Sequence, residues 1–558
     1  MKFIRTVVSL LSLPWLLPVV CLAQGSPWTD DVAKLRAQIA AQQKQLDEQR
    51  QALESAQAAI DSQRKMLDRL VAARSAPAAA PTQSAATEAV QPAPILPPAT
   101  GAAEADAKGR AFSPLAFHIG GADFTPGGFM DFATAWRSTN VGSGVATSFA
   151  AVPFSNTAAG RMDEFRSSAG NSRVTLTVTE NPTKKLAVTG YVEADFTGNQ
   201  PASLYVTSNS NTLRMRHFYV NLQQGKWEVL GGQTWTLMTP NRVGVSAVSS
   251  NVFVGQGEDS NYLTGLVWGR PGQLRVVYHP NKQWSIAASI ENPEQFVTTA
   301  TTLPAFAATQ VDNGSVPTTP NVRPDIVAKI AYDTQVSGKA LHFDLAGFSR
   351  QFRTSPAPDK YFDAQGVGGS FNTVLEVAKN FRLIANSFYS SGGGRYVVGL
   401  GPDFVVGPDG SISPVHAMAG IAGFEYAPTP KSQFYAYYGG AYFRRNYTLV
   451  SPGNYLGFGF PGSSSANRQF QEPMFGYYYT FWKNPKYGAL QIVTQYSYLT
   501  RAPWYVAPGT PATAHAHMIF GSLRFTLPKG SDESGGARLA ISMHQRRKPS
   551  GTARGMAN

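Results

Sequence analysis

The sequence predicts an all-β protein, a transmembrane antiparallel β-barrel of about 16 or about 18 strands that carries an N-terminal α-helical coiled coil. Three observations predict this class. Apolar and polar residues alternate with period two through most of the chain. No apolar run after residue 25 approaches the roughly 20 residues that a membrane helix needs. Charged residues make up only 15% of a chain that holds 52 Gly, 23 Tyr and 32 Phe.

The first residues have the features of a secretory signal peptide, which we expect to cover residues 1–23. Lys2 and Arg5 precede a short apolar run, and the segment from Cys21 to Ala23 supplies small residues before the cleavage point. A membrane anchor and a lipoprotein cleavage before Cys21 are the weaker interpretations, because the run is short and no small residue precedes the cysteine. Cys21 is the only cysteine, so we expect no disulfide in the mature protein.

Residues 28–74 predict a coiled coil. Every a position of an unbroken heptad pattern is apolar, and these positions are Val32, Ile39, Leu46, Leu53, Ile60 and Leu67. Gln42, Gln49 and Gln63 occupy d positions, where they weaken the seam and can set the number of strands. A helix that associates with copies of itself makes the protein an oligomer.

Two further segments flank the predicted barrel, which covers residues 112–528. Residues 75–111 are rich in Pro and Ala, without periodicity, and predict an extended linker. Residues 529–558 form a basic C-terminal tail. Part of this tail, residues 538–544, is the candidate for an additional strand if the barrel has about 18 strands.

Within the barrel region, each predicted strand has an apolar face and a polar face. In the hairpin from Arg173 to Phe196, Glu193 and Asp195 share the polar face. The segment from Leu213 to Leu222 is ambiguous in parity. Short turns alternate with long loops, as in transmembrane barrels, and we interpret Arg270-Pro271-Gly272 as one of the short turns.

Aromatic clusters favour lipid outside the barrel over a soluble β-sandwich. The runs 434–438 and 475–482 are rich in Tyr, Phe and Trp, which favour the boundary between lipid and water. A soluble all-β core of this size in one domain is improbable. We therefore expect the apolar faces to contact lipid and the polar faces to line a lumen.

Composition and motifs argue against other functions. From Phe112 to Pro528 the sequence has 30 Lys and Arg against 23 Asp and Glu, an excess too diffuse for nucleic-acid binding. The 8 His are scattered, no nucleophile motif is present, and no metal signature is present. We expect neither an enzyme nor a bound cofactor or metal.

Several motifs, in their order along the chain, resemble those of the DcaP-like outer-membrane porins. The similarity is densest in the following stretches: GGFMDFATAWRSTN (127–140), NSRVTLTV (171–178), GYVEADFTG (190–198), LRMRHFYVNL (213–222) and WEVLGGQTWTLM (227–238). The resemblance implies a homotrimer of sixteen-stranded barrels in the outer membrane of a Gram-negative-type bacterium, with the coiled coil in the periplasm. It also implies diffusion of small anionic organic solutes such as dicarboxylates. The tail after Pro528 departs from the family pattern, in which barrels end on an aromatic residue.

The resemblance and the polar faces together give a set of candidate pore-lining residues. They are Arg173, Glu193, Asp195, Arg214, Arg216, Arg242, Glu258 and Asp259. The stretch after Met238, through Arg242 to Asp259, corresponds to a loop that folds into the barrel. We expect Arg173, Arg214 and Arg216 to face Glu193 and Asp195 and to create a transverse field.

The sequence thus predicts a porin for passive diffusion of small polar solutes, with a modest preference for anions. Its expected partners are outer-membrane lipid, two further copies of the chain, and small anionic solutes. The alternative is a structural envelope protein, a barrel tethered to the peptidoglycan of the cell wall through its coiled coil. Conductance separates the two, because a plugged anchor does not conduct.

Overall fold

The computed structural model describes residues 113–199, 211–247, 252, 258–314 and 322–528. The predicted signal peptide (1–23), coiled coil (28–74), linker (75–111) and basic tail (529–558) lie outside the described residues. Within the described residues, no helix has the length and apolar character needed to cross a membrane.

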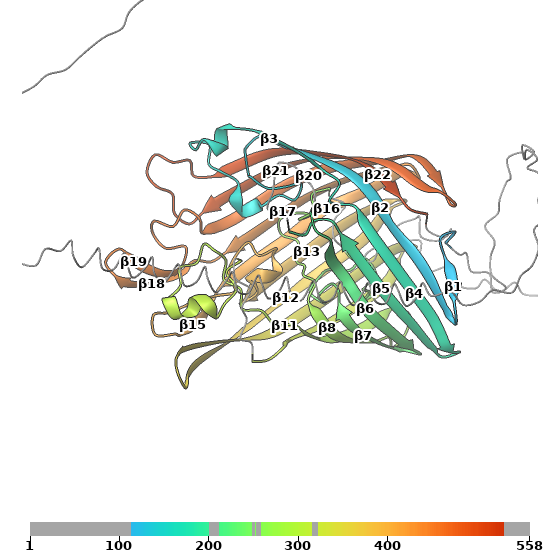
Figure 1. Cartoon of the computed structure of the whole chain (residues 1–558), viewed down its shortest axis with the longest axis horizontal. Helices are drawn as coiled ribbons and strands as arrows, with labels where there is room; N and C mark the ends of the chain where they lie inside the picture. The colour runs from blue at the N-terminus through green and yellow to red at the C-terminus, as the bar shows by residue number, and fades with distance from the viewer. Residues whose placement is uncertain (1–112, 200–210, 248–251, 253–257, 315–321, 529–558) are drawn as a thin grey trace, which may run out of the picture. The chain divides into compact units, whose positions relative to one another are not determined.

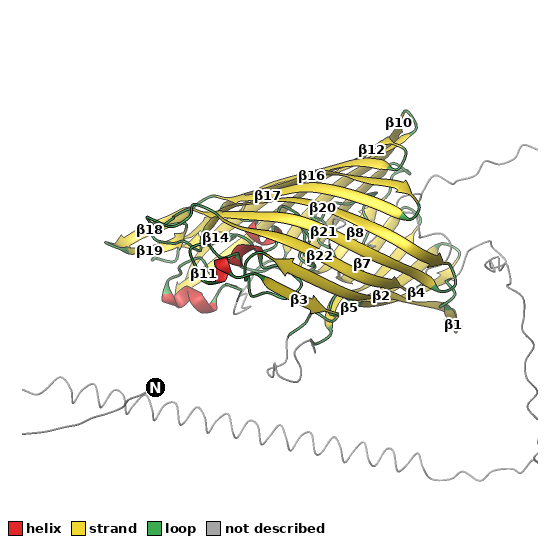
Figure 2. Ribbon diagram, turned by 90° about the horizontal axis from the view of Figure 1, so that it is seen from above, coloured by secondary structure: helices red, strands yellow, loops and turns green. Residues whose placement is uncertain are grey.

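Sixteen antiparallel strands form one closed barrel, seen from two directions in Figure 1 and Figure 2. The barrel strands have the following bounds: β2 (Ala122–Arg137), β3 (Glu164–Ser168), β4 (Arg173–Thr183), β5 (Leu186–Asp195), β6 (Arg214–Gln224), β7 (Trp227–Gln233), β8 (Gly272–Tyr278), β9 (Trp284–Glu291), β10 (Asp325–Val336), β11 (Lys339–Ala357), β12 (Lys360–Ala378), β13 (Phe381–Ser391), β16 (His416–Thr429), β17 (Ser432–Phe443), β20 (Asn467–Asn484), β21 (Gly488–Pro503) and β22 (Ala514–Thr526).

The count of sixteen treats β3 and β4 as one interrupted strand. Both pair with β2: β3 along residues 133–137 and β4 along residues 122–129. The first and last barrel strands, β2 and β22, pair with each other and close the barrel. This closure supports the smaller of the two predicted strand counts, and it uses no residue of the tail.

Several shorter elements are not strands of the barrel wall. They are β1 (Phe117–Ile119), which pairs with β2, the hairpins β14 (Phe404–Val406) with β15 (Ile412–Pro414) and β18 (Asn446–Ser451) with β19 (Asn454–Phe458), and the 3-10 helices η1 (Phe149–Ala151), η2 (Ala159–Arg161), η4 (Ala305–Thr309) and η5 (Gly394–Tyr396).

The two rims of the barrel differ, as the sequence predicted. One rim has short turns, including residues 184–185, 225–226, 337–338, 379–380 and 430–431. The other rim has the long connections, which are residues 138–163, 196–213, 234–271, 292–324, 392–415, 444–466 and 504–513. We call this second rim the loop rim. The turn between β11 and β12 is the short exception on the loop rim.

The outer face of the wall is apolar and the inner face is polar. On β9 and β10, Ile290 and Ile326 are exposed on the outside, whereas Glu291, Asp325 and Lys329 are buried on the inside. This alternation is the predicted one, and it places the apolar faces where lipid would cover a barrel in a membrane.

A β-bulge in β6 explains why its parity was ambiguous. Glu193 pairs with His217 while Ala194 pairs with Met215, so Arg216 is an extra residue in the ladder. A bulge places two consecutive side chains on one face. Arg216 and His217 are accordingly both buried inside, while Met215 is 52% exposed outside.

Neighbouring residues of β4 should respond oppositely to a new charge. Val174 is 49% exposed on the outer face and pairs with Gly128 and Ala194, whereas Thr175 points inward. An arginine towards lipid costs about 2–4 kcal/mol near the midplane. We therefore expect Val174→Arg to lower the free energy of unfolding by that amount and Thr175→Arg to leave it nearly unchanged, as measured by urea unfolding in lipid vesicles. Equal losses in both variants would contradict the outward assignment.

Candidate functional site

The connection between β7 and β8 folds into the barrel instead of standing on its rim. Side chains along this loop are almost fully buried, and they include Trp235, Leu237, Met238, Leu263, Leu266 and Val267. The described part of residues 234–271 therefore packs in the lumen, and the inward loop is longer at both ends than the expected stretch from Met238 to Asp259. The short turn expected at Arg270-Pro271-Gly272 is wrong, because these residues form the end of this loop and the start of β8.

Carboxylates on the inner wall hold the loop by its backbone. Four loop amides donate to four such side chains: Leu237 to Glu291 at 3.0 Å, Asn241 to Asp344 at 3.0 Å, Gly244 to Asp333 at 2.9 Å and Thr264 to Glu472 at 3.0 Å. A buried amide without an acceptor is costly. Acidic residues from β9, β10, β11 and β20 thus act as acceptors for the loop.

Glycines bring the loop against the wall of β16 and β17. Gly265 has φ of 90°, and a side chain there would overlap the carbonyl oxygens of Gly420 and Gly440. A side chain on Gly439 would overlap the Thr264 carbonyl oxygen. The two backbones can approach this closely only because Gly265 and Gly439 carry no Cβ.

Five of the predicted residues form one ion-paired cluster on β4, β5 and β6. Arg216 donates to Glu193 at 2.6 Å and to Asp195 at 2.8 Å. Arg214 binds Asp195 through two nitrogens, at 2.8 and 3.0 Å, and Arg173 lies 3.5 Å from Glu193. All five side chains belong to adjacent strands of one wall. The transverse field expected from them is therefore not formed, because opposite charges pair along the wall and do not face each other across the lumen.

The other three predicted residues lie at separate places. Arg242 forms a two-nitrogen ion pair with Glu425 of β16, at 2.7 and 2.9 Å. Glu258 accepts from Arg524 of β22 at 2.9 Å. Buried Asp259 accepts from the backbone of Thr147, in the 138–163 connection, at 3.1 Å. These side chains fix the loop to the wall and to a second loop.

Arg270 is a charged residue of the lumen that the sequence interpretation missed. Its guanidinium carbon lies 5.3 Å from the ring centroids of both Trp235 and Trp268. The two indole rings meet edge to face at 6.0 Å, and Trp268 meets Tyr262 edge to face at 5.4 Å. Tyr262 in turn accepts from Arg216 at 3.1 Å. Arg270 is thus stacked on aromatic rings next to the ion-paired cluster.

The surroundings of Arg270 contain hydrogen-bond donors without acceptors. Among the described residues, the buried nitrogens Nη1 of Arg270, Nε1 of Trp235, Nε1 of Trp268 and Nε of Arg173 have no hydrogen-bond partner. Every one of these atoms can only donate. Arg270 forms no ion pair with any described residue, and the undescribed segments between residues 200 and 321 contain no Asp or Glu.

Positive charge is therefore in excess at this wall. Arg173, Arg214 and Arg216 are close enough to act electrostatically on Arg270, whereas Glu193 and Asp195 are the only described carboxylates paired with this group of four cations. The side chains of Arg214 and Arg173 are 40% and 25% exposed, so the cluster reaches solvent in the lumen. The arrangement offers the positive charge of these arginines to an anion in the lumen. In the described part of the chain, no group of three metal-ligating side chains is found.

The barrel is similar to the crystal structure of the outer membrane channel DcaP of Acinetobacter baumannii. The TM-score is 0.54 and the identity is 18%, over 73% of this chain and 98% of that one. The anion-selective porin from Comamonas acidovorans is further away, with a TM-score of 0.42 and 12% identity over 73% of this chain and 100% of that one. No family model and no curated sequence matches this chain. The first similarity confirms the fold that the sequence motifs led us to expect.

Adjacent glycines of β17 allow the role of the loop contact to be tested. Gly439 faces Thr264, whereas a Cβ on Gly440 points outward and meets only the Phe470 carbonyl oxygen, at 3.4 Å. Gly439→Ala should displace the loop and change the single-channel conductance, while Gly440→Ala should conduct like the unmodified protein. Both should form barrels with normal heat-modifiable gel mobility. Identical conductance in both variants would show that this contact does not position the loop.

Proposed function

We propose that this protein is an outer-membrane porin through which small polar solutes diffuse passively, with a modest preference for anionic organic molecules such as dicarboxylates. The closed barrel, its apolar outer face and the charged inner wall support permeation. The similarity of the fold to a solved outer-membrane channel supports the same class.

The single observation that carries the preference for anions is the excess of positive charge around Arg270, where Glu193 and Asp195 balance only two of the four arginines Arg173, Arg214, Arg216 and Arg270. A carboxylate has acceptor oxygens only, and a guanidinium group binds it through two parallel hydrogen bonds. Guanidinium N–H groups of Arg214 and Arg216 donate to Glu193 and Asp195 within the wall. The partly exposed side chains of Arg214 and Arg173 present the surplus positive charge of this group to a passing anion.

Acidic residues limit the strength of this preference. Glu193 and Asp195 of β5 are paired with arginines, and Glu258 of the inward loop is paired with Arg524 of β22. Paired charges contribute little field at a distance. The surplus of two cations in this group, Arg270 included, then sets the sign of the selectivity, and its small size keeps the selectivity modest.

We further propose the assembly that the sequence suggested. The heptads of residues 28–74 support self-association, and the resemblance to the DcaP-like porins implies a homotrimer with the coiled coil in the periplasm, joined to the barrel by the linker of residues 75–111. In this arrangement the helices hold three barrels together without entering the membrane.

Removing the unpaired cation tests the preference. Arg270→Ser should move the reversal potential in a salt gradient towards cation selectivity. The shift should be larger at 0.01 M salt, where the Debye length is about 30 Å, than at 1 M, where it is about 3 Å. Arg353→Ser is the matched control, because Arg353 is an exposed arginine of β11 paired with Asp363 near the loop rim. A reversal potential that Arg270→Ser leaves unchanged at low salt would remove Arg270 from the pore.

A further inference from the structure

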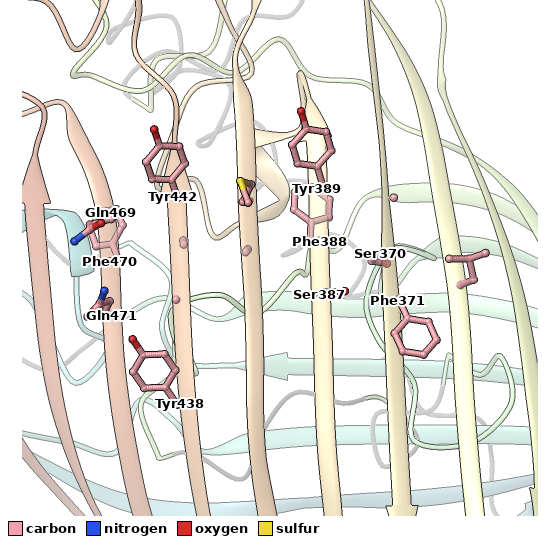
Figure 3. Close-up of a pocket in the computed structure, with 16 residues that line it drawn as sticks. Ser370, Phe371, Ser387, Phe388, Tyr389, Tyr438, Tyr442, Gln469, Phe470 and Gln471 are labelled. Atoms are coloured by element: carbon pink, nitrogen blue, oxygen red, sulfur yellow. The ribbon is translucent and has the colours of Figure 1, made fainter.

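A groove crosses the outer face of the barrel on β11, β12, β13, β16, β17 and β20. Its volume is about 680 Å³. Small residues, among them Gly369, Ser387 and Gly440, line it. Figure 3 shows Tyr389 and Tyr442 on one side of it and Tyr438 and Phe371 on the other.

The groove runs from the middle of β11 and β12 to the loop-rim ends of β17 and β20. Tyr442 and Gln469, which pair across β17 and β20, are the second residue from the end of β17 and the third residue of β20. The outward side chains of Tyr389, Met418 and Tyr438 are 50–55% exposed. In a membrane, this apolar groove would open into the hydrocarbon of the leaflet at the loop rim, close to its headgroups.

Arginines stand at the loop-rim end of the groove. The ring of Tyr442 meets that of Trp504 edge to face at 6.0 Å. The guanidinium carbons of Arg445 and Arg468 lie 5.3 and 5.8 Å from the Trp504 ring centroid, and Arg444 is exposed beside them in sequence. The groove and the arginines are therefore joined through Tyr442 and Trp504.

No described acidic residue pairs with these arginines. In the ranges that the structure describes, Arg444, Arg445 and Arg468 form no ion pair, and the internal undescribed segments contain no Asp or Glu. The Nε of Arg468 is buried without an acceptor. Three cations grouped at a membrane boundary, without a counter-charge among the described residues, attract anionic headgroups.

We propose that this surface binds a phosphorylated membrane lipid, with an acyl chain in the groove and the phosphate against Arg445 and Arg468. The groove alone would accept any apolar chain, and the arginines alone would accept any anion. Their continuity favours one molecule that carries both parts. Gln469 and Tyr442 line the groove at its loop-rim end and can donate to ester oxygens. The proposal rests on the membrane placement of the barrel but not on its conductance.

Native mass spectrometry of the full-length protein in detergent tests the proposal. Phosphatidylglycerol and phosphatidylcholine with identical chains are added in turn, and inorganic phosphate is added as a competitor. We expect retention of phosphatidylglycerol over phosphatidylcholine, and only weak competition by phosphate. Equal retention of both lipids would overturn the proposal. Displacement of the lipid by low concentrations of phosphate would also overturn it, because the site would then be an anion site alone.

Variants separate the two halves of the site. Gly440→Leu fills the groove, and the double change of Arg445 and Arg468 to Ser removes the headgroup contacts. Each should lower the retention of phosphatidylglycerol about tenfold or more. Ala436→Leu on the same face of β17 and Arg353→Ser near the loop rim are the matched controls, and they should retain lipid normally. Normal retention in Gly440→Leu or in the arginine variant would contradict the two-part site. Loss of lipid binding with unchanged conductance would leave the porin function standing.

Discussion

The arrangement of the lumen depends on inward-facing carboxylates that accept hydrogen bonds from the backbone of the 234–271 loop. A barrel wall satisfies its own backbone groups, but a loop packed inside it cannot do so, and an unpaired buried amide costs about 1–3 kcal/mol. Glu291, Asp333, Asp344 and Glu472 supply the missing acceptors. Because these acids come from strands on both sides of the loop, they fix its height and its path in the lumen.

This use of acidic residues has an electrostatic consequence. Carboxylates that pair with arginines contribute little net charge to the pore, so the selectivity is set by the charges that remain. Arg270 is the clearest of these, stacked on two tryptophans beside a wall in which cations outnumber acids. The modest excess of basic residues in the barrel sequence thus becomes a local excess at one level of the lumen.

The period-two pattern made the barrel predictable from sequence, because the face of each strand residue is a local property. It failed at Leu213–Leu222, since a bulge at Arg216 shifts the alternation and only the pairing with Glu193 and Ala194 reveals it. The partners in ion pairs could not be predicted from the sequence for another reason. Arg242 and Glu425 are 183 positions apart, and their contact depends on how an irregular loop crosses a closed barrel. Arg270 was missed because Pro271-Gly272 has the composition of a tight turn, and a long inward loop ends with the same residues.

The central claim is that a water-filled path remains beside the inward loop, and single-channel recording of the unmodified full-length protein in planar lipid bilayers tests it most directly. The account predicts discrete conductance steps that rise linearly with voltage. Exposed charged side chains such as Arg214 would then be in contact with the permeating solution. Purified, folded protein that inserts into the bilayer without any conductance steps would contradict the claim. It would favour the structural alternative, in which the loops plug the barrel.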